Sequence, residues 1–427
     1  MKTLCSIGLF GLLLSLGSTL KSYDGHSVIS IKTSTEEHVK AIQEMEAKEG
    51  LRGLDFWKEP RKVKGTVDVR VAPEHRMKME AFLLKHGLEY SVKLLDLGDV
   101  IRHEREVLKK RTIFKEGDFP SKLTLGQFHN LEEIHSYLRS VAARNNSSVS
   151  LINIGKSFQG RDLLGVKIGN PGPNKRATLM HGCLHSREWI GCSTMLFIIN
   201  ELTQNSQKYT SLLNSLDIYI IPVANPDGYQ FTWTEERLWR KTLSGPYGED
   251  NCYGVDPNRN WDFQFKVSGY SNDPCSETYA GPYGFSEVEP KAIADFLTQH
   301  KNSIKAYFDV HSYSEYFMYS YGYAYGALPK DWKRLDAVAA EAVQAIEAVH
   351  GQRFKYGPIV DVIYPASGSS VDWAKGVLNV TYPYALELRP DENAVWGFIV
   401  NQDQIIPAAQ ECWAGLQVVL HHAVFDN

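Results

Sequence analysis

The residues with the clearest capacity for chemistry lie in one short segment, residues 181–188. The segment follows an apolar run that is typical of a strand, and a helix could begin directly after it. A histidine and a glutamate three residues apart lie on one face of a turn, so both can bind one metal ion. Three residues on from His181 stands Leu184, which cannot bind a metal, whereas Glu188 stands three residues on from His185. The spacing therefore predicts His185 and Glu188 as ligands and His181 as a hydrogen-bonded strand residue, although a lone His-x-x-Glu also arises by chance.

A third ligand has to come from another part of the chain. His311 stands directly after the apolar run 304–310, at the end of a predicted strand, where α/β sheets place functional side chains. Two histidines and one carboxylate would leave the fourth tetrahedral position open, which is the arrangement of a catalytic zinc. Taken alone, His311 would more often be an ordinary buried core histidine than a metal ligand.

The elements that would position these residues belong to an α/β fold. Residues 148–154 and 163–168 predict a hairpin, residues 216–224 and 304–310 predict apolar strands, and residues 329–349 and 408–424 predict helices. Strands without polar alternation, separated by helices, indicate a sheet that is covered on both faces. We therefore expect a mixed, mostly parallel, twisted sheet with helices on both sides.

The composition excludes several classes of protein. The 427 residues are 43% hydrophobic and 22% charged, which excludes a disordered, collagen-like or coiled-coil chain. The 46 Lys and Arg against 50 Asp and Glu give a net charge of -4, so there is no basic field to hold nucleic acid. The apolar stretch near Leu4–Leu16 follows Lys2 and is too short for a membrane span, so it predicts a cleaved secretory signal at residues 1–17.

Secretion makes disulfide bonds possible, and five of the six cysteines lie beyond the predicted signal. Cys252 and Cys275 flank a polar, loop-like stretch, and we expect them to pair, with the other three as buried thiols. Asn145, Asn146 and Asn379 begin N-x-Ser/Thr sequons, which permit a glycan without requiring one.

A smaller unit precedes the α/β region. Residues 67–71 predict a strand, residues 74–86 an amphipathic helix and residues 90–92 another strand, which together indicate a small α+β unit. The unit ends in the mixed-charge run 102–106 and the basic cluster 109–111, which we interpret as an exposed linker. Such a linker is either a site for trypsin-like cleavage or an ordinary charged loop.

Beyond these features, seven collinear motifs identify a resemblance that covers essentially the whole chain. They are residues 185–189, 237–241, 254–262, 275–279, 311–314, 363–368 and 387–389. In this order they resemble the secreted zinc metallocarboxypeptidases of the pancreatic A/B type, in their proenzyme form.

The resemblance implies the metal centre and the catalytic groups. One Zn²⁺ would be held by His185, Glu188 and His311, the first of which would be hydrogen-bonded by Asp256. Glu387 matches the general base that takes a proton from the attacking water and passes it to the leaving amine. Arg240 matches the residue that polarises the scissile carbonyl and stabilises the oxyanion.

The resemblance also implies residues that hold the substrate. Asn258 and Arg259 match a clamp for the free carboxylate at the end of a peptide, and Tyr364 matches a mobile tyrosine that closes over it. Positions that contact upstream substrate residues are matched by Arg187, Tyr313 and Phe398.

The preference for the terminal residue depends on the floor of its pocket. Val371 stands where relatives that prefer basic termini carry an acidic residue, and an apolar floor cannot compensate a buried cation. We therefore expect release of aliphatic or aromatic termini, the A type, and Ala385 leaves room for bulky rings. Ser369 replaces a frequent glycine and His181 a frequent aspartate, which weakens finer predictions of specificity. The alternatives are a carboxypeptidase that prefers basic or acidic termini and a homologue that binds peptides without catalysis. An HExxH endopeptidase is excluded because the sequence contains no such motif.

The resemblance assigns the amino-terminal unit as an activation domain, an open α/β sandwich that covers the cleft. The predicted organisation is a signal peptide at 1–17, a propeptide at 18–111 and a zinc carboxypeptidase domain at 112–427. Cleavage after Arg111 or Lys115 by a trypsin-like protease would release the enzyme. The expected product is a secreted, extracellular monomer whose partners are peptides with a free C-terminus and the activating protease, with no nucleic acid or membrane partner.

Overall fold

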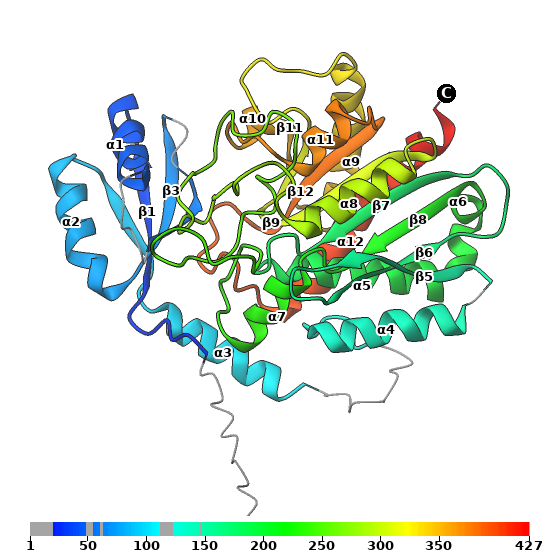
Figure 1. The fold of residues 1–427 in the computed structure, drawn as a ribbon, viewed down its shortest axis with the longest axis horizontal. Helices are drawn as coiled ribbons and strands as arrows, with labels where there is room; N and C mark the ends of the chain where they lie inside the picture. Colours follow the sequence, from blue (N-terminus) through cyan, green and yellow to red (C-terminus); the bar gives the residue numbers. More distant parts are fainter. Residues whose placement is uncertain (1–19, 48–53, 60–62, 112–122, 146, 427) are drawn as a thin grey trace, which may run out of the picture.

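The computed structural model describes residues 20–47, 54–59, 63–111, 123–145 and 147–426, which form a smaller and a larger part lying side by side (Figure 1). The predicted signal segment 1–17, Lys115 and Asn146 lie outside the described residues. None of the helices in the described ranges has the length and apolar character that a membrane span needs.

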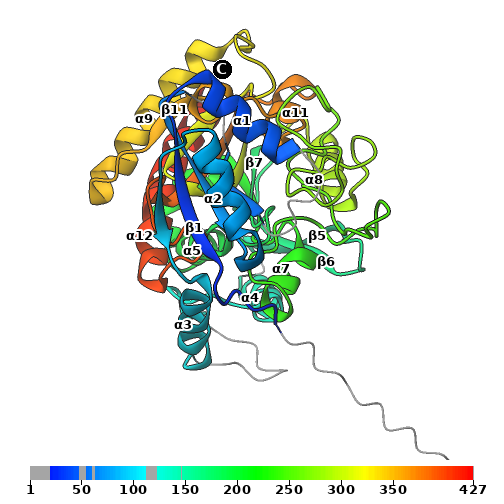
Figure 2. The ribbon, with the colours of Figure 1, turned by 90° about the vertical axis from the view of Figure 1, so that its left-hand side faces the viewer.

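The smaller part is an antiparallel sheet with two helices on one face. Its strands are β1 (Ser27–Thr33), β2 (Leu54–Lys58), β3 (Gly65–Val71) and β4 (Tyr90–Leu94), in the order β2-β3-β1-β4. Helices α1 (Glu36–Ala47) and α2 (Arg76–Lys85) cover the face that is turned away from the larger part (Figures 1 and 2). The strand and helix predictions for residues 67–92 are confirmed, with a short 3-10 turn at Pro73–His75 preceding α2.

The prediction of an exposed linker at residues 102–106 is wrong. These residues belong to helix α3 (Leu97–Lys109), whose first turn is capped by the side chain of Asp96. Ile101, Glu104 and Leu108 are buried along one side of the helix, at the three- and four-residue spacing of a helical face. The mixed charges concealed this face because one of its buried members is itself a glutamate. In the basic cluster that follows, Lys109 and Lys110 are exposed, whereas the side chain of Arg111 is 7% exposed.

The larger part contains an eight-stranded sheet in the order β11-β10-β12-β9-β7-β8-β6-β5. The four central strands β12, β9, β7 and β8 are parallel, whereas β10, β6 and β5 join through antiparallel pairs. The strand bounds are β5 (Val149–Lys156), β6 (Asp162–Ile168), β7 (Arg176–Gly182), β8 (Leu216–Ile221), β9 (Ile304–Ser314), β10 (Tyr316–Tyr319), β11 (Lys355–Pro358) and β12 (Tyr382–Asp391). The mixed, mostly parallel sheet expected from the sequence is confirmed, as is the hairpin of β5 and β6.

Helices cover both faces of this sheet (Figure 1). One core contains α4 (Leu131–Arg144), α5 (Trp189–Gln204), α9 (Trp332–His350) and α12 (Ile405–Phe425). The core on the other face contains α8 (Val288–Gln299) and α11 (Ser370–Gly376). Shorter helices are α6 (Thr210–Ser215), α7 (Pro226–Thr234) and α10 (Ile359–Val362). The two predicted long helices correspond to α9 and α12.

The candidate site lies at the carboxyl ends of the central strands. His185 and Glu188 occupy the short connection between β7 and α5, and Gly182 makes this connection possible. A Cβ at Gly182 would lie 2.7 Å from the backbone of Gly191, so only glycine lets α5 start so close to the strand end. On the neighbouring strands, Glu387 of β12 lies directly opposite His311 of β9 in the parallel register.

Candidate metal centre and active site

Three side chains converge at the end of β7 and β9 in an arrangement that could hold a metal ion. Nδ1 of His185 lies 2.9 Å from Oε1 of Glu188, and Nδ1 of His311 lies 2.9 Å from Oε2 of the same carboxylate. All three residues are buried, and one donor atom of each lies within 4.8 Å of the other two. Two imidazole nitrogens and one carboxylate form the donor set of catalytic zinc centres, so these residues fit a zinc ion.

The orientation of His185 is determined by a carboxylate behind it. Its Nε2 lies 3.0 Å from Oδ1 of Asp256, which leaves Nδ1 turned toward Glu188. The other oxygen of Asp256 accepts hydrogen bonds from Nε (3.2 Å) and Nη2 (2.9 Å) of Arg240. Burial alone would raise the pKa of Asp256, but the positive charge of Arg240 keeps this pKa well below its ordinary value. The carboxylate is therefore ionised and accepts the Nε2 proton of His185.

Glu387 faces the same centre without a full set of partners. It is partly buried on β12, and its Oε2, which is itself shielded from solvent, has no hydrogen-bond partner among the described residues. Burial raises the pKa of Glu387 to about 8, against the opposing effect of His311. A carboxyl group of this kind can exchange a proton with a reacting group near neutral pH.

Polar groups that suit a carboxylate lie beside the metal residues. Arg259 is 4% exposed and is held by its Nε, which donates to the carbonyl of Gly269 at 2.6 Å. Nη2 of Arg259 lies 3.4 Å from the hydroxyl of Tyr364. Asn258 lies next to this pair, with Nδ2 3.1 Å from Nε2 of His311. Together with Arg240, these groups give this side of the site a strongly positive and hydrogen-bonding character.

One cavity of about 420 Å³ joins all of these groups. Every residue predicted from the sequence as a metal, catalytic or substrate residue lines it, twelve in all: His185, Arg187, Glu188, Arg240, Asn258, Arg259, His311, Tyr313, Tyr364, Val371, Glu387 and Phe398. Asp256 lies behind this lining, in contact with His185 and Arg240.

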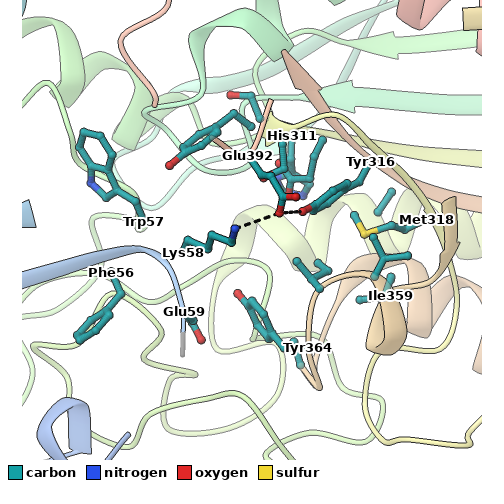
Figure 3. A pocket seen from close by; sticks show the side chains of 18 of the residues that line it. Phe56, Trp57, Lys58, Glu59, His311, Tyr316, Met318, Ile359, Tyr364 and Glu392 are labelled. Atoms are coloured by element: carbon teal, nitrogen blue, oxygen red, sulfur yellow. Dashed lines mark hydrogen bonds and ion pairs between the residues drawn. The ribbon is translucent and has the colours of Figure 1, made fainter. Parts of the chain in front are cut away.

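The far wall of the cavity is apolar. Val371 at the start of α11 is 1% exposed, and Met318 and Ala385 form a pair across β10 and β12. The lining continues with Ile359, Val362 and Ile363. Met318 and Ile359 lie on the same side of the cavity, beyond Tyr364 (Figure 3). A side chain that enters this space would meet hydrocarbon on most sides.

Glu392 is an acidic lining residue that sequence reasoning missed. Figure 3 shows it between Lys58 and Tyr316, which lie 3.0 Å and 2.7 Å from its Oε2. Lys355 contacts its other oxygen. Burial alone would raise the pKa of Glu392, but these three hydrogen bonds lower it to about 2. The carboxyl group of Glu392 is therefore ionised, and two lysines balance its negative charge. One of them, Lys58, comes from the smaller part of the protein.

The smaller part covers the cavity with residues that the sequence did not single out. Arg187 donates from Nη1 to both oxygens of Asp55, at 3.0 and 2.8 Å. The ring of Trp57 lies edge-to-face on Phe398, with centroids 5.4 Å apart, and Tyr313 contacts the same ring at 5.1 Å. Arg187 and Phe398, which are predicted to contact upstream substrate residues, therefore contact side chains of β2 instead.

A further ion pair joins the two parts outside the cavity. Nε and Nη2 of Arg237 donate to the two oxygens of Glu104 in α3, at 2.7 and 2.9 Å. Both side chains are buried, and the guanidinium also lies over the ring of Trp189. No signal in the sequence identifies such pairs, because the partners are 133 residues apart and each is an ordinary charged residue by itself.

The cysteines follow the expected pattern. Cys252 and Cys275 form a disulfide bond in the loop region before α8. Cys183, Cys192 and Cys412 are buried free thiols.

Comparison with known proteins decides the family. A family model described as zinc carboxypeptidase matches residues 134–415, and one described as carboxypeptidase activation peptide matches residues 29–104. The chain belongs to the zinc carboxypeptidase family. Carboxypeptidase A2 of Mus musculus is 40% identical over 405 residues, 94% of each chain. Carboxypeptidase A1 of Homo sapiens is 37% identical over 423 residues, 98% of this chain and 99% of the relative.

Solved structures agree with this zinc carboxypeptidase over its length. The carboxypeptidase A from Helicoverpa armigera superposes with a TM-score of 0.87 at 31% identity, covering 95% of this chain and 98% of the other. The structure of thrombin activatable fibrinolysis inhibitor superposes with a TM-score of 0.84 at 29% identity, covering 95% and 100%. The protein is thus an A-type carboxypeptidase zymogen that uses zinc, and its smaller part is the activation peptide.

Proposed function

We propose that this zymogen, once its propeptide is removed, hydrolyses the last peptide bond of peptides and releases aliphatic or aromatic C-terminal residues. The observation that carries the proposal is one cavity in which a His-Glu-His donor set, carboxylate-binding groups and an apolar wall lie together. An exopeptidase needs all three, because it has to activate water, hold the free terminus and accept one side chain.

In the proposed reaction, Glu387 and Arg240 act on the scissile bond. Zinc held by His185, Glu188 and His311 would act as a Lewis acid and increase the acidity of a water ligand. Glu387 accepts a proton from the attacking water and returns it to the leaving amine, which its raised pKa favours. Arg240 donates hydrogen bonds to the carbonyl oxygen as negative charge develops there.

Asn258, Arg259 and Tyr364 hold the free carboxylate of the substrate in this proposal. A guanidinium can bind a carboxylate through two parallel hydrogen bonds. The buried anchoring of Arg259 supports the role, because little conformational freedom is lost when substrate binds. An amidated terminus offers no negative charge to this clamp.

The preference for aliphatic and aromatic termini follows from the pocket wall. Val371, Met318 and Ala385 offer hydrocarbon and a small side chain, which leaves room for a ring. A lysine or arginine would lose its hydration there without gaining a counter-charge. The alternative, basic or acidic preference, would require a charged wall residue to outweigh Val371; Glu392 already has Lys58, Lys355 and Tyr316 as partners.

Activation would occur by cleavage after Arg111 or Lys115, which separates the propeptide at 18–111 from the catalytic domain at 112–427. Arg111 lies against the catalytic domain, with Nη1 2.5 Å from Oε2 of Glu133 and 3.0 Å from the carbonyl of Phe128. A trypsin-like protease that cuts there has to detach this side chain first. The apolar segment at 1–17 and the disulfide support export of the precursor, and we propose a secreted monomer.

Limited trypsin treatment of the purified precursor tests this function. Peptide hydrolysis should appear only after cleavage, disappear with a zinc chelator and return on addition of zinc. Sequencing of the new amino terminus should identify residue 112 or 116. Activity that needs no cleavage, or that persists without metal, would overturn the proposal.

A further inference from the structure

Asp309 lies next to the metal centre and has no role in the chemistry described above. It stands two residues before His311 on β9, so both side chains point to the same face of the strand. Both are buried, at 0% and 3% exposure. Oδ1 of Asp309 lies 2.9 Å from Nε2 of His311, which is the ring nitrogen turned away from Glu188.

Among the groups at Nε2 of His311, Asp309 is the one that can accept a proton: its Oδ1 lies at ion-pair distance and has no aligned hydrogen-bond donor among the described residues. The nitrogen that faces Glu188 is Nδ1, so in the metal-binding tautomer the ring proton is on Nε2. Asn258 also approaches Nε2, but through its amide nitrogen, which is a donor. The amide oxygen of Asn258 accepts from the backbone N–H of Ser370 at 3.0 Å, which explains this orientation.

The other contacts of Asp309 show how a carboxylate is accommodated at full burial. Oγ of Ser370 donates to its Oδ2 at 2.5 Å. His181 lies opposite it in the register of β7 and β9, with Nδ1 3.5 Å from Oδ1. Nε2 of His181 lies 2.6 Å from the hydroxyl of Tyr307, which can donate to it. Ser370 is thus the hydrogen-bond donor to this carboxylate among the described residues, whereas His181 Nδ1 and Asp309 Oδ1 face each other at 3.5 Å without a hydrogen-bond partner. A proton on Nδ1 of His181 would face the buried charge.

We infer that Asp309 is a positioning residue for the metal ligand His311, in the same way that Asp256 orients His185. It fixes the ring so that Nδ1 faces Glu188, and it makes that nitrogen a better donor by accepting the Nε2 proton. Through Ser370, the first residue of α11, it also connects the metal ligand with the helix that carries Val371. The inference rests on the metal site of the proposed function.

Zinc affinity tests this role independently of catalysis. The full-length precursor is stripped of metal and titrated with zinc in competition with a chromogenic chelator, for the wild type, Asp309→Asn, Asp256→Asn and Asp227→Asn. Asp227 is a matched control, because it is a fully buried carboxylate that accepts hydrogen bonds from Ser157 and Arg161, and it is absent from the lining of the cavity. We expect Asp309→Asn and Asp256→Asn to lower zinc affinity about 10–100-fold, and Asp227→Asn to leave it unchanged.

The outcomes distinguish the role of Asp309 from the existence of the metal site. A wild type that binds one zinc and an Asp309→Asn variant of equal affinity would overturn the role of Asp309 while leaving the proposed function intact. A wild type that binds no zinc would overturn the metal site itself. Thermal unfolding of the metal-free proteins is measured alongside, because a merely structural role would lower the melting temperature without changing the affinity of the folded protein.

A measurement on the wild type covers the case in which Asp309→Asn does not fold. In the zinc-loaded precursor labelled with ¹⁵N-histidine, NMR reports which ring nitrogen of His311 carries the proton and whether that proton is hydrogen-bonded. We expect an Nε2 proton that is shifted far downfield and exchanges slowly with water. A proton on Nδ1, or an Nε2 proton with the shift and exchange of an ordinary imidazole, would contradict the inference.

Discussion

Asp55 of the activation peptide and Arg187 of the catalytic domain form a buried ion pair in which one guanidinium nitrogen donates to both carboxylate oxygens, at 3.0 and 2.8 Å. The side chains are 2% and 1% exposed. Arg70 lies 3.4 Å from the same carboxylate, so one buried anion faces two cations. The pair closes the side of the cavity on which upstream substrate residues would lie.

The first prediction concerns this pair. Asp55→Asn should weaken docking of the propeptide by about 2–5 kcal/mol, or about 30-fold or more, because it removes the carboxylate that two buried guanidinium groups contact. After trypsin cleavage, the delay between the cut and the appearance of activity should shorten. Asp99→Asn is the control, because Asp99 is exposed and pairs only with neighbouring Arg102 in the described contacts. Equal delays in both variants would argue against a role of the pair in inhibition.

The second prediction concerns pH. Burial would raise the pKa of Asp55, but Arg187 and Arg70 lower it below its ordinary value. The contribution of Asp55 to docking is complete at any pH above its pKa in the free propeptide, which is about 3.9. This contribution is lost as pH falls through the lower pKa that Asp55 has in the docked state. The cut propeptide should therefore stay bound at pH 5 as firmly as at pH 7, as judged by gel filtration. Release at pH 5 would show that another group controls docking.

The third prediction concerns Glu387. Glu387→Gln should lower kcat by about 10²–10⁴-fold without loss of bound zinc, because the amide cannot accept the proton of water. In the activated wild type, kcat/KM should fall toward acid pH as Glu387 becomes protonated. Burial raises its pKa to about 8, and a bound divalent cation would lower it, so we expect the midpoint between about 4.5 and 8. A variant with zinc bound and near-normal kcat would exclude Glu387 as the base.

The fourth prediction concerns the pocket floor. Val371→Asp should shift the ratio of kcat/KM for C-terminal Arg over Phe upward by about 30-fold or more, because a buried cation gains a counter-charge worth about 2 kcal/mol. Val371→Asn is the matched control, since asparagine has nearly the shape of aspartate and is polar but carries no charge. If both variants keep the wild-type ratio, the side chain of the terminal residue does not reach Val371.

Much of the architecture could be predicted because it depends on local patterns. Apolar runs identified β8 and β9, alanine-rich periodicity identified α9, and the spacing of His185 and Glu188 suggested two ligands. The resemblance of seven motifs supplied the remaining site residues.

The parts that could not be predicted depend on contacts between distant residues of ordinary type. Asp55 meets Arg187 across 132 positions, and its sequence surroundings carry no mark of that contact. The position of Asp309 next to the metal centre depends on β9, which places it beside His311, and on β7, which places His181 opposite it. The sequence of helix α3 resembles a charged linker because Glu104, a charged residue, belongs to its buried face.

The central claim, that the activated chain is a zinc-dependent exopeptidase for apolar termini, is tested most directly by one hydrolysis assay. Trypsin-activated protein is incubated with peptides that differ only at the last residue, each as the free acid and as the amide, and products are identified by mass spectrometry. The account predicts release of a single C-terminal Phe or Leu from the free acids, slower release of Arg and Glu, and no cleavage of the amides. Internal cleavage, equal cleavage of the amides, or faster release of Arg or Glu than of Phe or Leu would contradict it.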